Sequence, residues 1–192
     1  MKTLLVTICA ALLTALPVAC LLATAENPKP VSADGVHRLA PRAFPALPPS
    51  IVADLESRDC TVPQTYFLPE PHNVIHGEFR RPGQHDWAVL CSKSGSSTIL
   101  VYWAGSPSDV EALADPSSDT RWMQYIVDDR VGFSRLIASV AKSGIIAGYE
   151  AYREGPKPPP IDHNGISDAF AEKASTVFYW YDGEWLRLAG SD

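Results

Sequence analysis

STVFYWYDGEWLRLA, residues 175–189, carries the clearest fold signal in the chain. Asp182-Gly183 is a dipeptide that type I′ turns favour, because both central residues of such a turn need positive φ. With a two-residue turn at this point, Trp180 lies directly opposite Trp185. The sequence therefore predicts a tight antiparallel hairpin over 175–189.

The same register gives this hairpin two apolar faces. One face carries Val177, Tyr179, Leu186 and Leu188, and the other carries Phe178, Trp180, Trp185 and Arg187. Two interpretations fit this pattern. Either the hairpin is buried on both sides, or Trp180 and Trp185 form an exposed aromatic platform for a protein or glycan ligand.

A second hairpin is predicted over 87–103. Two β-rich runs flank Lys93-Ser94-Gly95-Ser96, and small polar residues with a glycine are typical of hairpin loops. Elsewhere the patterns predict short helices at 51–58, with Ser50 as N-cap, and at 109–114, and strands at 122–127 and 133–140. Residues 145–152 fit either a helix or a strand, because short apolar runs do not show their period. The predicted fold class is α+β, mainly antiparallel β-sheet with two hairpins and a few short helices.

The first 25 residues have the pattern of a secretory signal, with a basic start at Lys2, an apolar run and a small-residue ending at Ala25. The run from 4 to 25 is also long enough to span a bilayer, and Cys20 is a candidate for lipid modification. We therefore predict export to the periplasm or the extracellular space. Membrane contact is expected only through an uncleaved signal or a lipid anchor.

Composition changes after the predicted signal. Residues 26–49 contain six prolines and little apolar periodicity, which predicts a flexible linker. The remainder, 50–192, has the length of a single globular domain.

The charge balance argues against nucleic acid as a partner. The chain has 22 acidic and 16 basic residues and a formal net charge of −6, with no basic cluster. No motif for a cofactor is present either, so none is predicted.

Four cysteines occur in the sequence. Cys9 and Cys20 lie in the predicted signal, which leaves Cys60 and Cys91. Two cysteines of an exported protein usually pair, and this disulfide would contribute roughly 3 kcal/mol by closing its loop. The alternative is a reactive thiol.

Residues 77–92, GEFRRPGQHDWAVLCS, contain a Gly-Glu-Phe step, a polar loop, and Asp86 before an apolar strand. This pattern resembles one FG-GAP or VCBS-type repeat over 74–103. The resemblance implies a blade of a β-propeller whose loop holds Ca²⁺. No second copy is found in the chain, so a single sheet is predicted rather than a full propeller.

The calcium chemistry of that repeat is not retained here. Ca²⁺ takes six to eight oxygen ligands, and the ligand positions of the repeat fall at Glu78, Arg80, Pro82 and Asp86. Only Glu78 and Asp86 bring a carboxylate, so no metal site is predicted. We expect Asp86 to accept hydrogen bonds from N–H groups of the loop backbone instead.

A wider resemblance covers about two-thirds of the chain that follows the signal. DWAVLCS at 86–92 and the tail DHNGISDAF…EKAS…YW…GEW…GSD at 162–192 are similar to secreted bacterial proteins of no assigned function. This resemblance implies no particular activity.

Catalytic motifs are sparse. Gly132 to Leu136 begins like a nucleophile elbow but lacks its second glycine. His72 and His76 have zinc-ligand spacing for a helix, whereas their neighbours favour a strand. Asp162-His163-Asn164-Gly165 is either a turn or part of a ligand site.

The sequence favours an exported, non-catalytic binding or envelope-associated domain. Its candidate binding residues are Trp180, Trp185, Asp162 and His163. The alternative is a secreted hydrolase with a site around Asp162, His163 and Asp168. A third possibility is a structural remnant of a propeller family.

Overall fold

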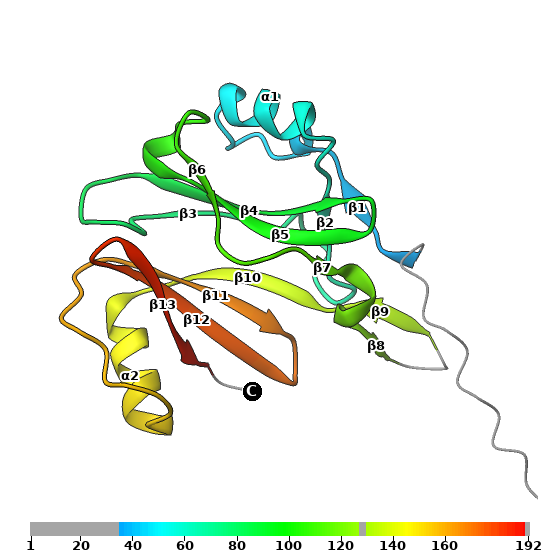
Figure 1. The fold of residues 1–192 in the computed structure, drawn as a ribbon. Coiled ribbons are helices and arrows are strands. Elements are labelled where there is room, and N and C mark those ends of the chain that lie inside the picture. Colours follow the sequence, from blue (N-terminus) through cyan, green and yellow to red (C-terminus); the bar gives the residue numbers. More distant parts are fainter. Residues whose placement is uncertain (1–34, 127–129, 191–192) are drawn as a thin grey trace, which may run out of the picture. The chain divides into compact units, whose positions relative to one another are not determined.

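The computed structural model describes residues 35–126 and 130–190. The predicted signal at 1–25, with Cys9 and Cys20, lies outside these residues. In the described part the fold is mainly antiparallel β-sheet with two short α-helices and is not a propeller, as the sequence predicts (Figure 1).

Two larger sheets make up most of the fold. The first contains β3 (Val74–Gly77), β4 (Asp86–Lys93), β5 (Ser96–Tyr102) and β6 (Val110–Ala112), with β7 (Ser117–Ser118) beside β5. The second contains β10 (Arg135–Val140), β11 (Gly165–Phe170), β12 (Ala174–Tyr181) and β13 (Glu184–Ala189). Two small pairs complete the set: β1 (Arg38–Leu39) with β2 (Val62–Pro63), and β8 (Met123–Tyr125) with β9 (Val131–Phe133).

The two larger sheets face each other across the main core, and one helix packs on each outer face. Helix α1 (Pro49–Ser57) packs on β4 and β5, and α2 (Lys142–Tyr152) packs on β12 and β13 (Figure 1). Three short 3₁₀ turns lie between these elements, at Pro41–Ala43, Trp103–Gly105 and Asp119–Trp122.

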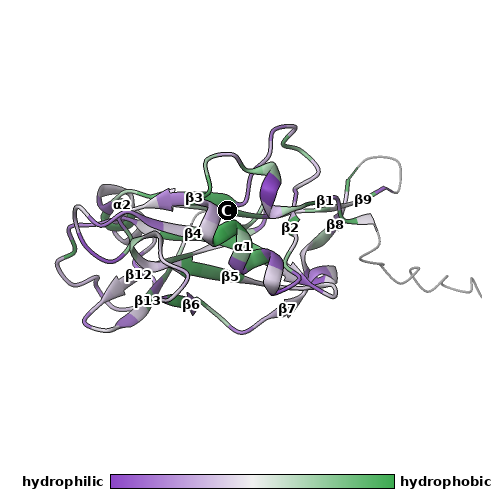
Figure 2. Ribbon diagram, turned by 90° about the horizontal axis from the view of Figure 1, so that it is seen from above, coloured by the Kyte–Doolittle hydropathy of each residue, from purple (hydrophilic) through white to green (hydrophobic). Residues whose placement is uncertain are grey.

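Alternation along β4 and β5 explains why they form the centre of the fold. Leu90 and Val101 point into the main core, whereas Val89 and Leu100 point toward α1. A strand that is buried on both faces has a nearly continuous apolar run, and β5 is among the most hydrophobic segments (Figure 2).

Both predicted hairpins are confirmed. Trp180 pairs with Trp185, and Asp182 and Gly183 have φ of 48° and 91°, as a type I′ turn requires. In the hairpin predicted at 87–103, the turn is the two residues Ser94-Gly95 and not the four-residue loop 93–96, because Lys93 pairs with Ser96.

The helix and strand predictions hold in part. The helix at 51–58 is α1, but its N-cap is Pro48, and Ser50 lies inside the first turn. Proline at the first helical position has its φ already set for a helix, which explains the earlier start. The ambiguous segment 145–152 belongs to α2. The predicted strand at 122–127 contains β8, although residue 127 lies outside the described residues, and the predicted strand at 133–140 contains β10. Strand β9 ends where the second of these ranges begins, so most of it was not predicted.

Two predictions are wrong or incomplete. The range 109–114 contains strand β6 (Val110–Ala112) instead of a helix, since these three residues pair with the edge of β5. Strand β11 was not predicted, because the turn-like Asn164-Gly165 hides its beginning.

Part of the predicted linker is packed. Within 35–49, Phe44 and Leu47 are 7% and 4% exposed and join the core under α1, and Arg38–Leu39 pairs with β2. The prolines of this segment shape an ordered connection, because apolar side chains between them provide anchors. Residues 26–34 lie outside the described part.

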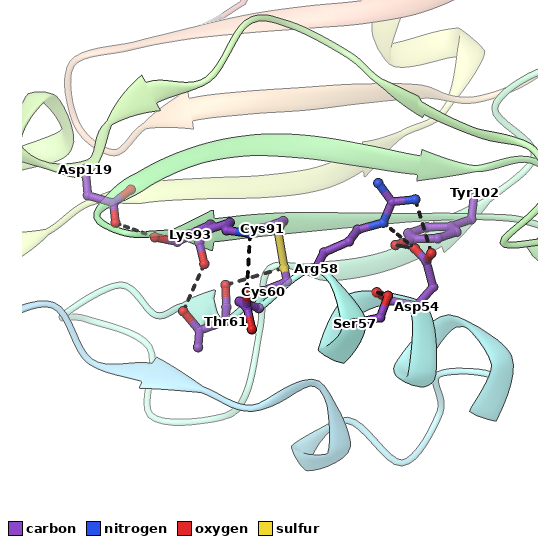
Figure 3. Close-up of a disulfide and its surroundings, with 11 residues drawn as sticks. Asp54, Ser57, Arg58, Cys60, Thr61, Cys91, Lys93, Tyr102 and Asp119 are labelled. Atoms are coloured by element: carbon purple, nitrogen blue, oxygen red, sulfur yellow. Dashed lines mark hydrogen bonds and ion pairs between the residues drawn. A yellow bond between two sulfur atoms is a disulfide. The ribbon is translucent and has the colours of Figure 1, made fainter.

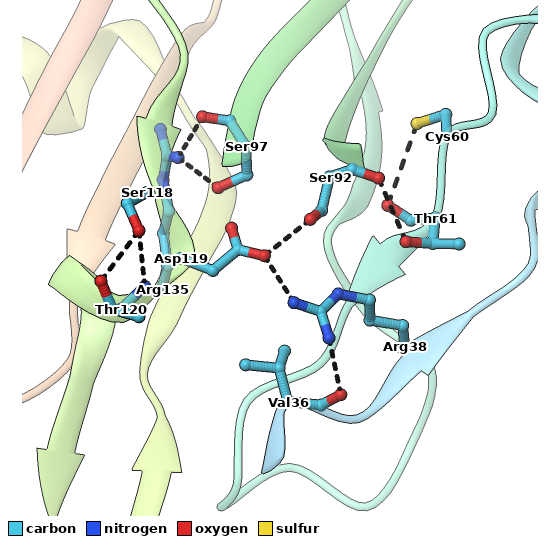
Figure 4. Close-up of polar contacts among 10 residues, drawn as sticks. All are labelled: Val36, Arg38, Cys60, Thr61, Ser92, Ser97, Ser118, Asp119, Thr120 and Arg135. Carbon is cyan, nitrogen blue, oxygen red and sulfur yellow. Dashed lines mark hydrogen bonds and ion pairs between the residues drawn. The ribbon is translucent and has the colours of Figure 1, made fainter. Parts of the chain in front are cut away.

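Buried polar groups tie the layers together. Arg135 on β10 donates to the backbone and hydroxyl oxygens of Ser97 on β5 (Figure 4). It also donates to both carboxylate oxygens of Asp168, each at 2.8 Å. Asp119 accepts from Arg38 at 2.7 Å and from Ser92 at 2.6 Å. These bonds connect β5 with β10 of the second sheet, and, through Asp119, they connect β4 with β1.

Candidate functional site

The candidate site is an opening on the outer face of β4 and β5, beside α1. An α-helix rises about 1.5 Å per residue and a strand about 3.3 Å, so the nine residues of α1 are much shorter than the eight-residue β4. The helix therefore covers only part of the sheet. The end of the sheet next to the Ser94-Gly95 turn remains open.

A pocket of about 440 Å³ lies at this open end, within the size range of small-molecule sites. Its lining comprises Arg58, Cys91, Lys93, Ser96, Thr98, Leu100 and Pro116. The floor comes from one face of the β4–β5 hairpin, where Cys91 pairs with Thr98 and Lys93 pairs with Ser96. Arg58 forms the wall at the end of α1.

The end of α1 is fixed by a Schellman turn. The N–H of Asp59 donates to the carbonyl of Glu56, and the N–H of Cys60 donates to the carbonyl of Leu55, both at 3.0 Å. Asp59 has a φ of 58°, the left-handed conformation that this turn needs at the residue after the cap. The turn places Cys60 next to the sheet.

The predicted disulfide between Cys60 and Cys91 is present, with a Cα–Cα distance of 5.4 Å (Figure 3). It connects the segment after α1 with β4, and Cys91 also lines the pocket. The wall and the floor of the pocket are thus covalently joined.

Arg58 is held by Asp54 on the preceding turn of the helix. Its Nε and Nη2 donate to the two carboxylate oxygens at 2.6 and 3.1 Å, and Tyr102 Oη donates to the same carboxylate at 2.8 Å (Figure 3). The hydrogen bond from Arg58 lowers the pKa of Asp54 despite partial burial. Burial, with Asp54 beside it, raises the pKa of Tyr102.

Lys93 forms a looser contact at the other side of the pocket. Its Nζ lies 3.2 Å from Asp59 Oδ2, and the two side chains are 58% and 80% exposed. Ion pairs between such exposed groups contribute about 0 to 1 kcal/mol, so this carboxylate is easily exchanged for another.

Trp180 and Trp185 lie elsewhere, at the rim of the core between the two larger sheets. They contact each other at 5.4 Å between ring centroids, and both contact the buried Trp103, at 5.1 and 5.4 Å. The guanidinium of Arg80 lies 5.1 Å from the Trp103 ring and 5.4 Å from the Trp180 ring. Their aromatic faces are therefore already in contact with other side chains of this chain.

The loop at 162–165 packs against the loop that follows β3. Asn164 Oδ1 accepts from the N–H of Glu78 at 3.0 Å, and the N–H of Asn164 donates to the Glu78 carbonyl at 2.8 Å. His163 is buried and contacts the Asn164 carbonyl, whereas Asp162 is exposed. Both carboxylate oxygens of Asp168 are bound by Arg135.

Asp86 has the role that the sequence predicts. It is fully buried, and its carboxylate accepts from the backbone N–H groups of Phe79, Arg80 and Ala104 at 2.8 to 3.2 Å. Gln84 donates to it as well, at 2.7 Å. The carboxylate therefore organises the loop at 77–86.

His72 closes the base of the loop between β2 and β3. Its Nε2 accepts from the N–H of Thr65 at 2.6 Å, and its Nδ1 lies 2.7 Å from the Glu70 carbonyl. Burial lowers the pKa of His72, which favours the neutral ring that these two bonds require. Ser134, in the elbow-like segment, is fully buried and donates to the Gly132 carbonyl.

Among the described residues, no group of three or more histidine, cysteine, aspartate or glutamate side chains is arranged to hold a metal ion. None of the helices in 35–126 and 130–190 has the length and apolar character to span a membrane. Compared with protein-family models, curated proteins and solved structures, the chain matches none. The similarity of 74–103 to an FG-GAP or VCBS-type repeat thus stays a prediction.

Sequence reasoning missed the pocket because its parts come from distant segments. Arg58 and Pro116 reach the β4–β5 hairpin only through tertiary packing. One signal was present, however. With the Ser94-Gly95 turn in register, Lys93, Ser96 and Thr98 fall on the same face as Cys91.

Proposed function

We propose that this protein is an exported, non-catalytic binding domain that holds a small amphipathic ligand in the pocket beside the disulfide. The observation that carries this proposal is the lining, which has a partly apolar floor at Cys91, Leu100 and Pro116 and two cationic side chains at its edge. Binding pockets commonly combine an apolar body with a few polar groups that orient the ligand.

Two further observations support parts of the proposal. The disulfide indicates an oxidising environment, which agrees with the export predicted from residues 1–25. The carboxylates nearest to the pocket, Asp54 and Asp59, are each paired with one of the two cations at its edge, Arg58 and Lys93.

The test is binding of eight-carbon probes, 1-octanol and octanoate, to the purified protein by calorimetry. Ser96→Trp would fill the pocket from its floor, and tryptophan is compatible with a strand. We expect this variant to weaken probe binding about tenfold or more, equivalent to at least about 1.4 kcal/mol.

Ser143→Trp on α2 is the matched control, because it adds the same side chain at an exposed position on the other outer layer. It should bind the probes like the wild type. If neither probe binds the wild type, or if Ser96→Trp binds as well as Ser143→Trp, the pocket is not the site and the proposal fails.

A further inference from the structure

We infer that the ligand of this pocket is a monocarboxylate with an apolar chain, and that its head group takes the place of Asp59 at Lys93. This inference rests on the proposed function and specifies the class of ligand. It follows from the charges at the edge of the pocket and from the way each one is paired.

The two cations at the edge are held to different degrees. Arg58 forms two hydrogen bonds to Asp54, whose carboxylate also accepts from Tyr102 and is only 18% exposed. Lys93 has a single contact with Asp59, and both groups are mostly exposed. Lys93 is therefore the cation whose partner an incoming anion can replace at little cost.

The present partner of Lys93 is itself a carboxylate on a fixed backbone. Asp59 is the left-handed residue of the Schellman turn, so its side chain is attached at the end of α1. Exchange of one carboxylate for another leaves the charge at Lys93 balanced. A dianion such as a phosphate monoester would bring a second negative charge close to both Asp54 and Asp59, which disfavours it.

The floor of the pocket determines the rest of the ligand. Leu100 and Cys91 are nearly buried in the layer under α1, and Pro116 also lines the pocket. Burial of a methylene group contributes about 0.8 kcal/mol, so a chain of several carbons would gain more from this floor than a short polar acid. The head group then stays at the exposed edge, beside Lys93.

The experiment compares octanoate with 1-octanol, which share the chain and differ in charge. We expect octanoate to bind the wild type more tightly than 1-octanol. Lys93→Gln should weaken octanoate about threefold to fivefold, as expected for one exposed ion pair, and leave 1-octanol unchanged. Lys142→Gln on α2 is the charge-matched control and should change neither affinity.

Asp59→Asn should strengthen the binding of octanoate, the opposite of Lys93→Gln. Asparagine tolerates the left-handed conformation but has no charge, so Lys93 loses its competitor. Octanoate should then bind more tightly by a similar factor, again with no change for 1-octanol. Unfolding of each variant by heat checks that the fold is retained.

The outcomes separate the two proposals. If both probes bind equally and Ser96→Trp weakens both, the pocket is a binding site but the carboxylate class is wrong. If octanoate binds and neither Lys93→Gln nor Asp59→Asn changes its affinity, Lys93 is not the head-group contact and the inference fails. If no probe binds, the proposed function fails first.

Discussion

The two outer layers of this domain have the same architecture but differ in how firmly they are attached. Helix α1 packs on β4 and β5 through a cluster of ten buried residues that includes both cysteines of the disulfide. Helix α2 packs on β12 and β13 through a cluster of three, and Ile145 is its one buried residue in the described structure. The layer with the firm attachment is also the one that contains the candidate pocket.

The difference has a physical origin in the helix sequences. The inward positions of α1 carry Ile51 and Leu55, both fully buried. On α2, Gly144 and Gly148 line a cavity of about 190 Å³ between the helix and the sheet. A rigid wall preserves the shape of an open pocket, whereas a loosely packed helix does not. This comparison leads to four predictions, from the largest effect to the smallest.

Truncation of one buried aliphatic side chain in each layer should show the difference in packing between the two layers most clearly. Leu55→Ala should lower the free energy of unfolding by about 4 kcal/mol, because the well-packed layer under α1 cannot collapse into the cavity. Ile145→Ala should cost about 2 kcal/mol, since α2 already borders a cavity and can adjust. Urea denaturation of both variants measures this, and equal losses would show that the two layers are packed equally well.

Removal of the disulfide should weaken the attachment of the α1 layer and so reduce its difference from the α2 layer. Replacement of Cys60 and Cys91 by alanine should lower the free energy of unfolding by about 3 kcal/mol, given their separation of 31 residues. Wild-type protein unfolded with a reductant present is the control for the change in side chains. A loss below about 1 kcal/mol in both samples would mean that the buried cluster alone fixes α1.

The features that the sequence predicted correctly depend on local chemistry. The register of β12 and β13 follows from Asp182-Gly183 alone, because the turn type sets the pairing. Asp86 was correctly assigned to the backbone of its own loop. The disulfide was predictable because only Cys60 and Cys91 lie outside the predicted signal.

The features that were wrong or missed depend on tertiary contacts. The segment 109–114 is too short to show a period, and pairing with the edge of β5 decides that Val110–Ala112 form a strand. Trp180 and Trp185 were correctly paired with each other, but their contact with Trp103 and Arg80 joins segments far apart in the sequence. The pocket likewise combines α1, the β4–β5 hairpin and Pro116, which no local pattern connects.

Replacement of a glycine in α2 by alanine is expected to stabilise the protein. Gly148 lies inside the helix, and a Cβ at this position meets no atom within 4 Å, so Gly148→Ala should raise the free energy of unfolding by about 0.5 to 1 kcal/mol. At Gly144 a Cβ would lie 3.0 Å from Val140, and Gly144→Ala should gain less. Thermal unfolding of the two variants tests this pair, and an equal or larger gain at Gly144 would contradict the structure of this layer.

The smallest effect concerns the charge that holds Arg58 at the wall of the pocket. The pKa of Asp54 is lowered from its ordinary value of 3.8, first because Arg58 donates to its carboxylate. The stabilisation from this ion pair is therefore present above about pH 3.8 and is lost as the pH falls through the lower pKa of the folded state.

Asp54→Asn should cost less than about 1 kcal/mol at pH 7, because the pair is near the surface. The difference between wild type and variant should shrink as the protein is taken to pH 3 and below, measured by urea denaturation across that range. A difference that stays constant down to pH 2 would show that Asp54 acts through its shape and its bond to Tyr102, and that charge contributes nothing to the position of Arg58.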